Sequence, residues 1–467
     1  MKKSLLAIAA MTAFAGAAQA QSSVTIYGVL DVGVMGQSNS DMINGSTAGA
    51  SAPLGQGALG NSTKTSTATR NGNAFGFMSG GESTSRLGFK GQEDLGGGTK
   101  AIFQLEQQFS SANGSENGSG LPGNGTSSVG MGNLSNTADS SKTGQLFNGM
   151  AYAGLSNDKY GTLTMGRQLT LMADNIGAYD PIPSAQFSPL GIYGAYGGGG
   201  TTDNGRANGA FKYKQNIMGF NIGALYAPGG YAGANSVGQR LEGQIGYEKA
   251  TWGIVASTAY QADSTNLGGV TYGTATGTSA GIYNPSGQPT AGTNMVNAVV
   301  SNTRSAQLTA KWQPMDKLML KTGFMYWNIG TPSGMQYLAG QPVLPNGSGF
   351  SVFNYQAMQS PKIQNTFWLG ANYDFTPAIK GSLAYYQQNT NGGPSSISSI
   401  ASGTGRTTWI TASTDYYLSK RTNLYVIATQ ANLTGNNVAT SQSTTSGLVG
   451  TPITQQFTYG LGMRHTF

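Results

Sequence analysis

The chain ends on Phe457-Thr458-Tyr459-Gly460-Leu461-Gly462-Met463-Arg464-His465-Thr466-Phe467. Every second residue from Phe457 to Met463, and again Phe467, is large and apolar, whereas the alternate positions are small or polar. Because successive side chains of a strand point to opposite faces, the stretch predicts a strand with one apolar and one polar face. An export signal at the other end of the chain indicates that this apolar face meets lipid rather than a soluble core.

The first twenty residues have the parts of a secretory signal peptide. A charged start, Lys2 and Lys3, precedes an apolar run, and Ala18-Gln19-Ala20 has the small-residue pattern of a cleavage site. The run is too short to span a bilayer as a helix, which takes about 20 residues. We therefore expect residues 1–20 to be removed and residues 21–467 to fold as one domain, with an uncleaved anchor as the alternative.

The composition argues against both a soluble globule and a helical membrane protein. Charged residues make up 9% of the chain, against roughly 25% in ordinary globular domains. The chain has 72 glycines, no cysteine and 38% hydrophobic residues. No apolar run after the signal has the length of a membrane helix. A β-barrel explains these values, because only every second residue of its strands faces lipid and its closed sheet pairs all backbone polar groups.

Period-2 alternation predicts an all-β fold, a transmembrane antiparallel β-barrel of about sixteen strands. Connections alternate strictly between short turns and long loops, whereas stacked soluble β-sandwiches would have connections of similar length. The strands are expected near 23–35, 83–92, 99–110, 147–156, 160–169, 207–216, 219–228, 238–248, 251–262, 303–313, 317–328, 363–374, 378–389, 405–418, 421–432 and 455–467. The long loops are expected near 36–82, 111–146, 170–206, 263–302, 329–362 and 433–454.

Aromatic residues near strand ends are typical of the girdles that flank a membrane. The sequence places such residues at positions 312, 326–327, 367–368, 385–386, 409 and 416–417.

Three motifs, together with the last strand, resemble general porins of the Gram-negative outer membrane, especially those of β-proteobacteria. Ser23-Val24-Thr25-Ile26-Tyr27-Gly28-Val29-Leu30-Asp31 is similar to the first strand of these porins. Ser85-Arg86-Leu87-Gly88-Phe89-Lys90-Gly91 resembles their second strand, and Tyr160-Gly161-Thr162-Leu163-Thr164-Met165-Gly166-Arg167-Gln168 the strand before their constriction loop. The order and spacing of the motifs extend the resemblance over residues 21–467.

The resemblance implies a homotrimer of water-filled barrels in the outer membrane, each narrowed by a third external loop folded into the lumen. The implied function is passive diffusion of small hydrophilic solutes and ions. The implied surroundings are outer-membrane lipid and lipopolysaccharide, and the barrel-insertion machinery would read the terminal Phe467.

The resemblance also implies a basic cluster on the barrel wall that faces acidic residues of the inward loop. Arg86 and Arg167 match the family motifs, and Arg206 matches more loosely. Alternation directs Arg86 into the lumen, but it directs Arg167 toward lipid unless a bulge turns that residue round. A salt bridge from such an arginine to Asp31 or Glu106, which would only stiffen the wall, is the alternative interpretation.

Acidic candidates come from the loop 170–206, which contains Asp174, Asp180 and Asp203 and no Glu. Asp180, in Tyr-Asp-Pro, is the preferred candidate and Asp174 the second.

Other charged residues fall on the inward side of their strands by the same alternation. Because inward basic residues outnumber acidic ones, the sequence predicts weak anion selectivity. These lumen-facing candidates include Glu106, Lys212 and Lys321.

Enzymatic and nucleic-acid functions find no support in the sequence. The single histidine, His465, lies on the lipid side of the last strand, so we expect no catalytic site, no metal site and no cofactor. Basic residues are scattered rather than clustered with aromatics, so no nucleic acid is expected. Two alternatives remain: a channel specific for sugars or small organic anions, and a surface adhesin on a barrel scaffold. A sugar channel needs a series of lumenal aromatics, which Tyr27 and Tyr152 do not obviously form.

We expect signal cleavage after Ala20, because the small-residue site follows a short apolar run. The intact mass of the purified protein measures this. A mass that includes residues 1–20 would contradict the prediction.

Overall fold

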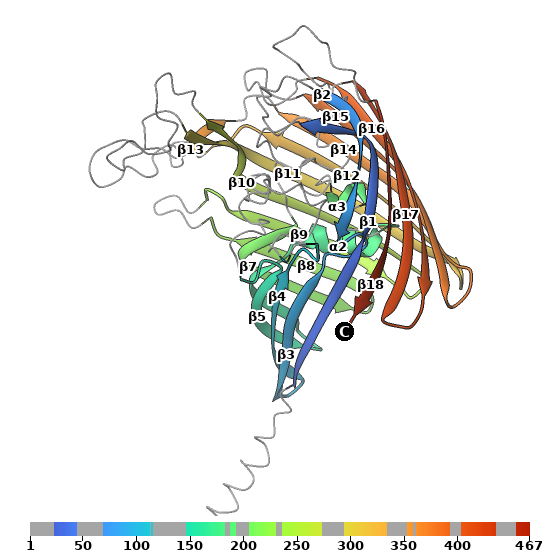
Figure 1. The fold of residues 1–467 in the computed structure, drawn as a ribbon. Helices are drawn as coiled ribbons and strands as arrows, with labels where there is room; N and C mark the ends of the chain where they lie inside the picture. The colour runs from blue at the N-terminus through green and yellow to red at the C-terminus, as the bar shows by residue number, and fades with distance from the viewer. Residues whose placement is uncertain are drawn as a thin grey trace, which may run out of the picture.

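The computed structural model describes residues 23–43, 69–112, 114, 146–182, 187–192, 205–229, 236–272, 294–333, 353–357, 361–392, 403–435 and 454–467. Within these ranges the chain forms a closed antiparallel barrel whose strands follow one another round the wall (Figure 1). The expected signal peptide, residues 1–20, lies outside the described residues.

Sixteen strand positions make up the barrel in the described part of the chain, which confirms the predicted fold class. A further short strand, β13 (Phe353–Ala357), pairs in parallel with β11. The barrel strands are β1 (Ser23–Ile43), β2 (Thr69–Ser79) with β3 (Arg86–Gly96) in one position, β4 (Thr99–Gln108), β5 (Met150–Asn157), β6 (Gly161–Leu169), β7 (Arg206–Ile217), β8 (Phe220–Ala227), β9 (Arg240–Glu248), β10 (Trp252–Tyr272), β11 (Asn294–Met315), β12 (Leu318–Gly330), β14 (Lys362–Asp374), β15 (Ile379–Gly392), β16 (Gly405–Tyr417), β17 (Thr422–Gly435) and β18 (Gln455–Thr466).

The barrel closes between its first and last strands. β1 pairs with β18 from Val29 opposite Thr466 to Gln37 opposite Thr458. At the end of this seam Phe467 and Gly28 exchange two backbone hydrogen bonds, each 3.1 Å long. The chain terminus is therefore part of the sheet rather than a free tail.

The second barrel position is broken into β2 and β3, which both pair with β1. The sequence places residues 69–79 in the first loop, whereas the structure extends the wall with them. The link between the two halves, residues 80–85, is held by the carboxylate of Asp31. This carboxylate accepts the N–H groups of Gly81 at 3.2 Å, Glu82 at 3.0 Å and Ser83 at 2.8 Å, and the Tyr425 hydroxyl at 2.6 Å.

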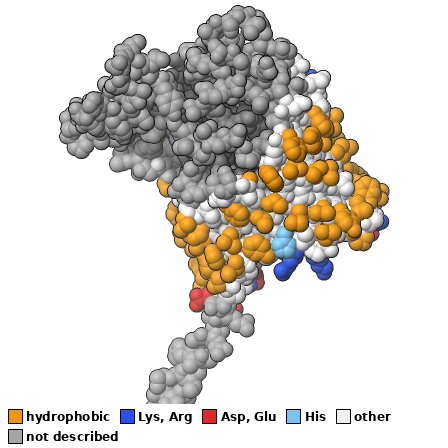
Figure 2. All heavy atoms as spheres, in the orientation of Figure 1, with side chains coloured by type: hydrophobic (Ala, Val, Ile, Leu, Met, Phe, Trp, Pro, Cys, Tyr) orange, Lys and Arg blue, Asp and Glu red, His pale blue; other side chains and the backbone are white. Residues whose placement is uncertain are grey.

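The outer face of the wall is apolar, as the alternation predicts. On β18 the side chains of Phe457, Tyr459, Leu461 and Met463 are 39–48% exposed, whereas Thr458 between them is fully buried. Figure 2 shows many hydrophobic side chains spread over the visible part of the barrel wall. No helix in the described residues is long and apolar enough to cross a membrane.

Two helices lie inside the ring of strands, in the connection between β6 and β7 (Figure 1). They are α2 (Leu171–Tyr179) and the single turn α3 (Pro189–Ile192). Thr170 caps α2, since its hydroxyl accepts the backbone N–H of Ala173 at 3.1 Å. We call the connection, residues 170–205, the inward loop.

Deletion of Phe467 is expected to reduce the yield of assembled barrel, because it removes the last two hydrogen bonds of the closing seam. The measurement is the yield of heat-modifiable protein from outer membranes. Met218→Ala is the control, since Met218 is a turn residue that is 91% exposed. Equal yields from the deletion and the control would contradict the prediction.

Candidate functional site

Three arginines on three strands gather beside one stretch of backbone inside the barrel. Arg167 donates from Nε and Nη2 to the carbonyl of Asn148, at 3.0 and 2.8 Å. Arg206 donates from Nε to the next carbonyl, that of Gly149, at 2.7 Å. The N–H of Gly149 donates at 2.9 Å to the backbone carbonyl of Glu106, whose side chain lies near Arg86. We call Arg86, Arg167 and Arg206 the arginine wall.

Arg167 lies at a bulge in the pairing of β6 with β7. The register between β6 and β7 shifts between Gly166 and Gln168. Gly166 has φ of +131°, a conformation that side chains other than glycine rarely adopt. Arg167 is 7% exposed, and its guanidinium donates to the carbonyl of Asn148 and to Asn208 Oδ1. The extra residue of the bulge is on β7, where Asn208 and Gly209 stand opposite Arg167 alone, and this places the Asn208 side chain beside the guanidinium.

Arg86 lies beside Glu106 and is still accessible from the lumen. Its Nε is 3.6 Å from Glu106 Oε2, and its side chain is 34% exposed. Glu106 is 3% exposed and also accepts hydrogen bonds from the Tyr27 hydroxyl at 3.0 Å and from Gln108 at 3.2 Å. Glu106 therefore has the structural role of the alternative interpretation, because it is buried and bonded to neighbouring wall residues. Arg86 is only loosely bridged to Glu106 and its side chain remains partly exposed.

Asp174 lies on α2 between two lysines of β7. Its carboxylate accepts from Lys212 Nζ at 2.6 Å and from Lys214 Nζ at 3.0 Å. Both lysines face inward, as alternation predicts. Because one acid meets two bases, this end of the inward loop does not neutralise the positive charge of the wall.

Asp180 differs from the expectation that it is an acid facing the channel. It is 1% exposed, and its carboxylate accepts from the Tyr386 hydroxyl at 2.6 Å, the N–H of Ile182 at 3.0 Å and the Ser188 hydroxyl. Burial raises the pKa of Asp180 to about 6, although these hydrogen bonds favour the charged form. Lys321 donates to the backbone carbonyl of Asp180 at 3.0 Å. The third loop acid, Asp203, lies outside the described residues.

Sequence analysis missed two acids that hold α2 in place. Glu242 accepts the first helical N–H, that of Leu171, at 2.7 Å and forms a buried salt bridge with Arg240. Glu248 accepts the Tyr179 hydroxyl and Lys311 Nζ, both at 2.7 Å. Alternation on β9 directs both acids inward, so their orientation was available from the sequence. Their contacts with α2 were not, because those depend on where the loop lies.

Four aromatic residues that the sequence assigns to the membrane girdle face the lumen instead. Trp327, Trp368, Tyr386 and Trp409 are at most 1% exposed, and we call them the aromatic wall. In two cases the neighbouring aromatic faces outward: Phe367 is 42% exposed and Tyr385 37%. Parity therefore divides each of these adjacent pairs between the two faces.

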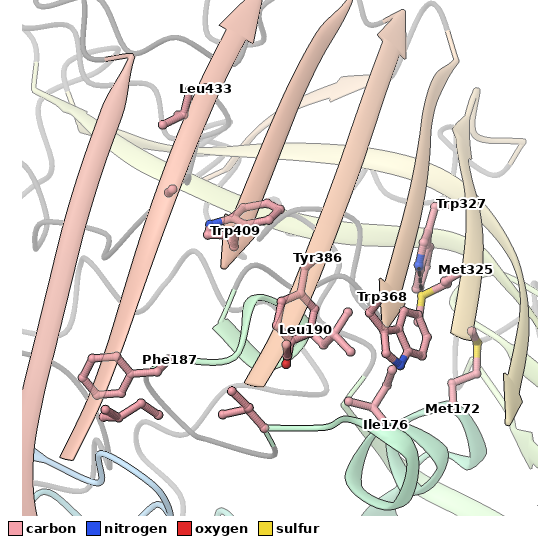
Figure 3. Close-up of a cluster of buried hydrophobic side chains, with 14 of the residues drawn as sticks. Met172, Ile176, Phe187, Leu190, Met325, Trp327, Trp368, Tyr386, Trp409 and Leu433 are labelled. Atoms are coloured by element: carbon pink, nitrogen blue, oxygen red, sulfur yellow. Dashed lines mark hydrogen bonds between the residues drawn. The ribbon is translucent and has the colours of Figure 1, made fainter. Parts of the chain in front are cut away.

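The aromatic wall forms one buried cluster with apolar side chains of the inward loop. Figure 3 shows Met172, Ile176, Phe187 and Leu190 of the loop among Trp327, Trp368, Tyr386 and Trp409.

The described part of the inward loop contacts every barrel strand from β7 to β18, and its apolar cluster also includes Met35 of β1 and Met78 of β2. The arginine wall lies on β3, β6 and β7. The contacts, in strand order, are Asp174 with Lys212, Leu171 with Gly223 and Glu242, Asn175 with Ser257, Met172 with Ser305, Asp180 with Lys321 and Tyr386, Tyr179 with Trp368, and Phe187 with Thr411, Thr429 and Gly460.

No group of three or more histidine, cysteine or acidic residues within the described ranges could hold a metal ion.

Comparison with known proteins points to one family. The model of the Gram-negative porin family matches residues 7–436. An outer membrane porin protein of Bordetella pertussis is 35% identical over 182 residues, 39% of this chain and 37% of that protein. Outer membrane porin protein 32 of Delftia acidovorans is 30% identical over 276 residues, 58% of this chain and 62% of that protein. The chain thus spans less than two thirds of the length of these relatives.

Among solved structures, the anion-selective porin from Comamonas acidovorans matches with a TM-score of 0.58. The match covers 96% of this chain and 100% of that one at 21% identity, so it shows a shared fold.

Gly166→Ala is expected to destabilise the protein by about 1–3 kcal/mol, the usual cost of a residue held in a disfavoured conformation. A Cβ at this position would lie 2.3 Å from the carbonyl oxygen of Ala151. Gly177→Ala in α2 is the matched control, because no atom lies within 4 Å of its added Cβ. Urea titration gives the free energy of unfolding, and equal values for the two variants would contradict a strained bulge.

Proposed function

The chain belongs to the Gram-negative porin family, and we propose that it forms a water-filled channel for passive diffusion of small hydrophilic solutes and ions, with a weak preference for anions. It is an outer-membrane protein, and its family indicates a channel rather than an enzyme.

One observation carries the anion preference. The arginine wall presents an accessible guanidinium, since the Arg86 side chain is 34% exposed. The nearby acids are engaged: Glu106 is buried, and Asp174 is shared by two lysines. Fixed positive charge at a narrow place acts on every passing ion, because the Debye length at physiological salt is about 8 Å. The fold neighbour from Comamonas acidovorans, described as anion-selective, agrees with this preference.

The alternatives gain less support. A sugar channel needs aromatic faces exposed to the passage, but the aromatic wall is buried under the inward loop. A channel specific for small organic anions would also use the arginine wall. It would differ from the proposed channel only in its affinity for those anions. An adhesin would act through the long external loops, most of which lie outside the described residues.

We also propose that the protein is a homotrimer that loses residues 1–20 on export and is inserted by machinery that reads Phe467. Its outer apolar face would contact lipid and lipopolysaccharide. The exposed apolar side chains of β18 and the family membership support this assembly.

Swelling of liposomes that contain the purified protein tests the channel. We expect small neutral and charged solutes to enter at rates that fall with size. An adhesin would leave the liposomes impermeable to the solutes. A specific channel would admit one class of solute, at rates that saturate as the solute concentration rises.

Replacement of Arg86 or Arg167 by serine is expected to shift the reversal potential in a salt gradient toward cations. A unit charge about 5 Å from an ion in water contributes roughly 0.8 kcal/mol, or several-fold in relative permeability. Arg86→Ser should have the larger effect, since Arg86 is the more exposed.

The control is Lys90→Ser. Lys90 faces the lumen near the short turn after β3, with its Nζ 5.4 Å from the ring centroid of Tyr27. It should change the reversal potential little. If both arginine variants keep the wild-type value, the arginine wall does not determine selectivity.

A further inference from the structure

The inward loop meets the barrel wall through three successive backbone carbonyls at the C-terminal end of α2. The carbonyl of Tyr179 accepts Trp368 Nε1 at 3.1 Å, and that of Asp180 accepts Lys321 Nζ at 3.0 Å. The carbonyl of Pro181 accepts Asn372 Nδ2 at 2.6 Å. Helices end with carbonyls that lack partners in the helix, so this wall supplies donors where the loop needs them.

The carboxylate of Asp180 joins this contact point to two other places. Toward the wall it accepts the Tyr386 hydroxyl of β15 at 2.6 Å. Toward the loop it accepts the N–H of Ile182 at 3.0 Å and the Ser188 hydroxyl, next to α3. A single side chain thus connects the end of α2, the next wall strand and the later part of the loop.

Two glycines of the wall provide seats for the loop on either side of this connection. A Cβ at Gly370 would lie 2.5 Å from Cβ of Pro181, and a Cβ at Gly460 would lie 2.6 Å from Cζ of Phe187. The loop therefore lies against bare backbone at both places, and only glycine permits so close an approach.

The apolar cluster beneath the loop explains why the loop stays attached to the wall, but not why it takes one alignment along the wall. Hydrophobic contact is non-directional, so it tolerates sliding of one surface over another. A buried carboxylate is costly unless hydrogen bonds satisfy it, and those bonds form in one arrangement only. The carboxylate of Asp180 binds Tyr386 on the wall and Ile182 and Ser188 in the loop, so its hydrogen bonds hold the loop in one alignment with the wall.

We infer that Asp180 and Tyr386 are positioning residues, which fix the inward loop against β12–β18 and thereby set the width of the passage beside the arginine wall. This inference rests on the proposed channel function. In this inference Asp180 does not contact passing ions. It affects them indirectly, because it holds the loop that narrows the passage.

Tyr386→Phe is the decisive variant, because it removes one hydroxyl and replaces no residue of the arginine wall or of the loop. Asp180→Asn and Ser188→Ala weaken the same connection from the loop side. The matched control is Tyr385→Phe on the same strand, since Tyr385 faces outward and its hydroxyl binds Gln387 at 2.9 Å.

The readouts are single-channel conductance, exclusion of neutral polymers of graded size, and reversal potential. Loss of one hydrogen bond should weaken docking of the loop about five-fold. We expect Tyr386→Phe to raise mean conductance on the order of 1.5-fold, to admit larger polymers and to lower anion selectivity, because a wider passage screens its wall charges. Tyr385→Phe should match the wild type in all three.

Acrylamide quenching of tryptophan fluorescence gives a readout that needs no ion flow. The chain has five tryptophans, and three of them, Trp327, Trp368 and Trp409, lie buried in the aromatic wall. Quenching should increase in Tyr386→Phe and in Ser188→Ala at unchanged yield of folded protein, and stay at the wild-type level in Tyr385→Phe.

The inference is overturned if Tyr386→Phe and Ser188→Ala match the control in conductance, polymer exclusion and quenching, while Asp180→Asn shifts only the reversal potential. That result would make Asp180 a selectivity charge. Failure of the proposed function looks different, because the wild-type protein itself would then conduct no ions while the quenching comparison still reports docking of the loop.

Discussion

The structure depends on the pairing of every backbone polar group that the hydrocarbon surrounds. Hydrocarbon offers no hydrogen bonds, so a sheet that crosses it has to close on itself. Here closure joins the two ends of the chain, with β1 against β18 and Phe467 against Gly28. The carboxylate of Asp31 completes the same region from inside, because it holds the break in the second barrel position and binds Tyr425 of β17. The seam thus combines backbone pairing on the wall with a buried polar centre behind it.

Closure in turn creates an interior too wide to be filled by wall side chains, and the inward loop divides it unequally. Contacts of the loop run from β7 to β18 and include the apolar cluster of the aromatic wall. Charged residues also take part in these contacts, because Asp174 binds Lys212 and Glu248 binds both Tyr179 and Lys311. These acids are paired with bases, whereas Arg86 of the arginine wall is 34% exposed.

Several features of the protein follow from the sequence alone. Alternation defines which residues face lipid on β18, and it directs Arg86, Lys212 and Glu106 inward without any knowledge of packing. These predictions succeed because the period of a strand is fixed by backbone geometry. They are incomplete where that geometry is interrupted: the register between β6 and β7 shifts beside Arg167, and the break after Ser79 extends the second strand position beyond its predicted limits.

The tertiary structure decides what the inward-facing side chains touch. Asp180 has the same sequence signal as an acid that faces the channel, yet Tyr386 is 206 residues away along the chain and binds it inside a buried contact. From the sequence, Trp368 is a membrane-girdle residue, whereas in the structure it is buried and donates to the Tyr179 carbonyl of the loop. The sequence by itself determined the barrel, its two faces and its basic lumen, because those depend on local periodicity. The position of the loop, and with it the roles of Asp180 and the aromatic wall, came only from contacts between distant segments, which no local pattern encodes.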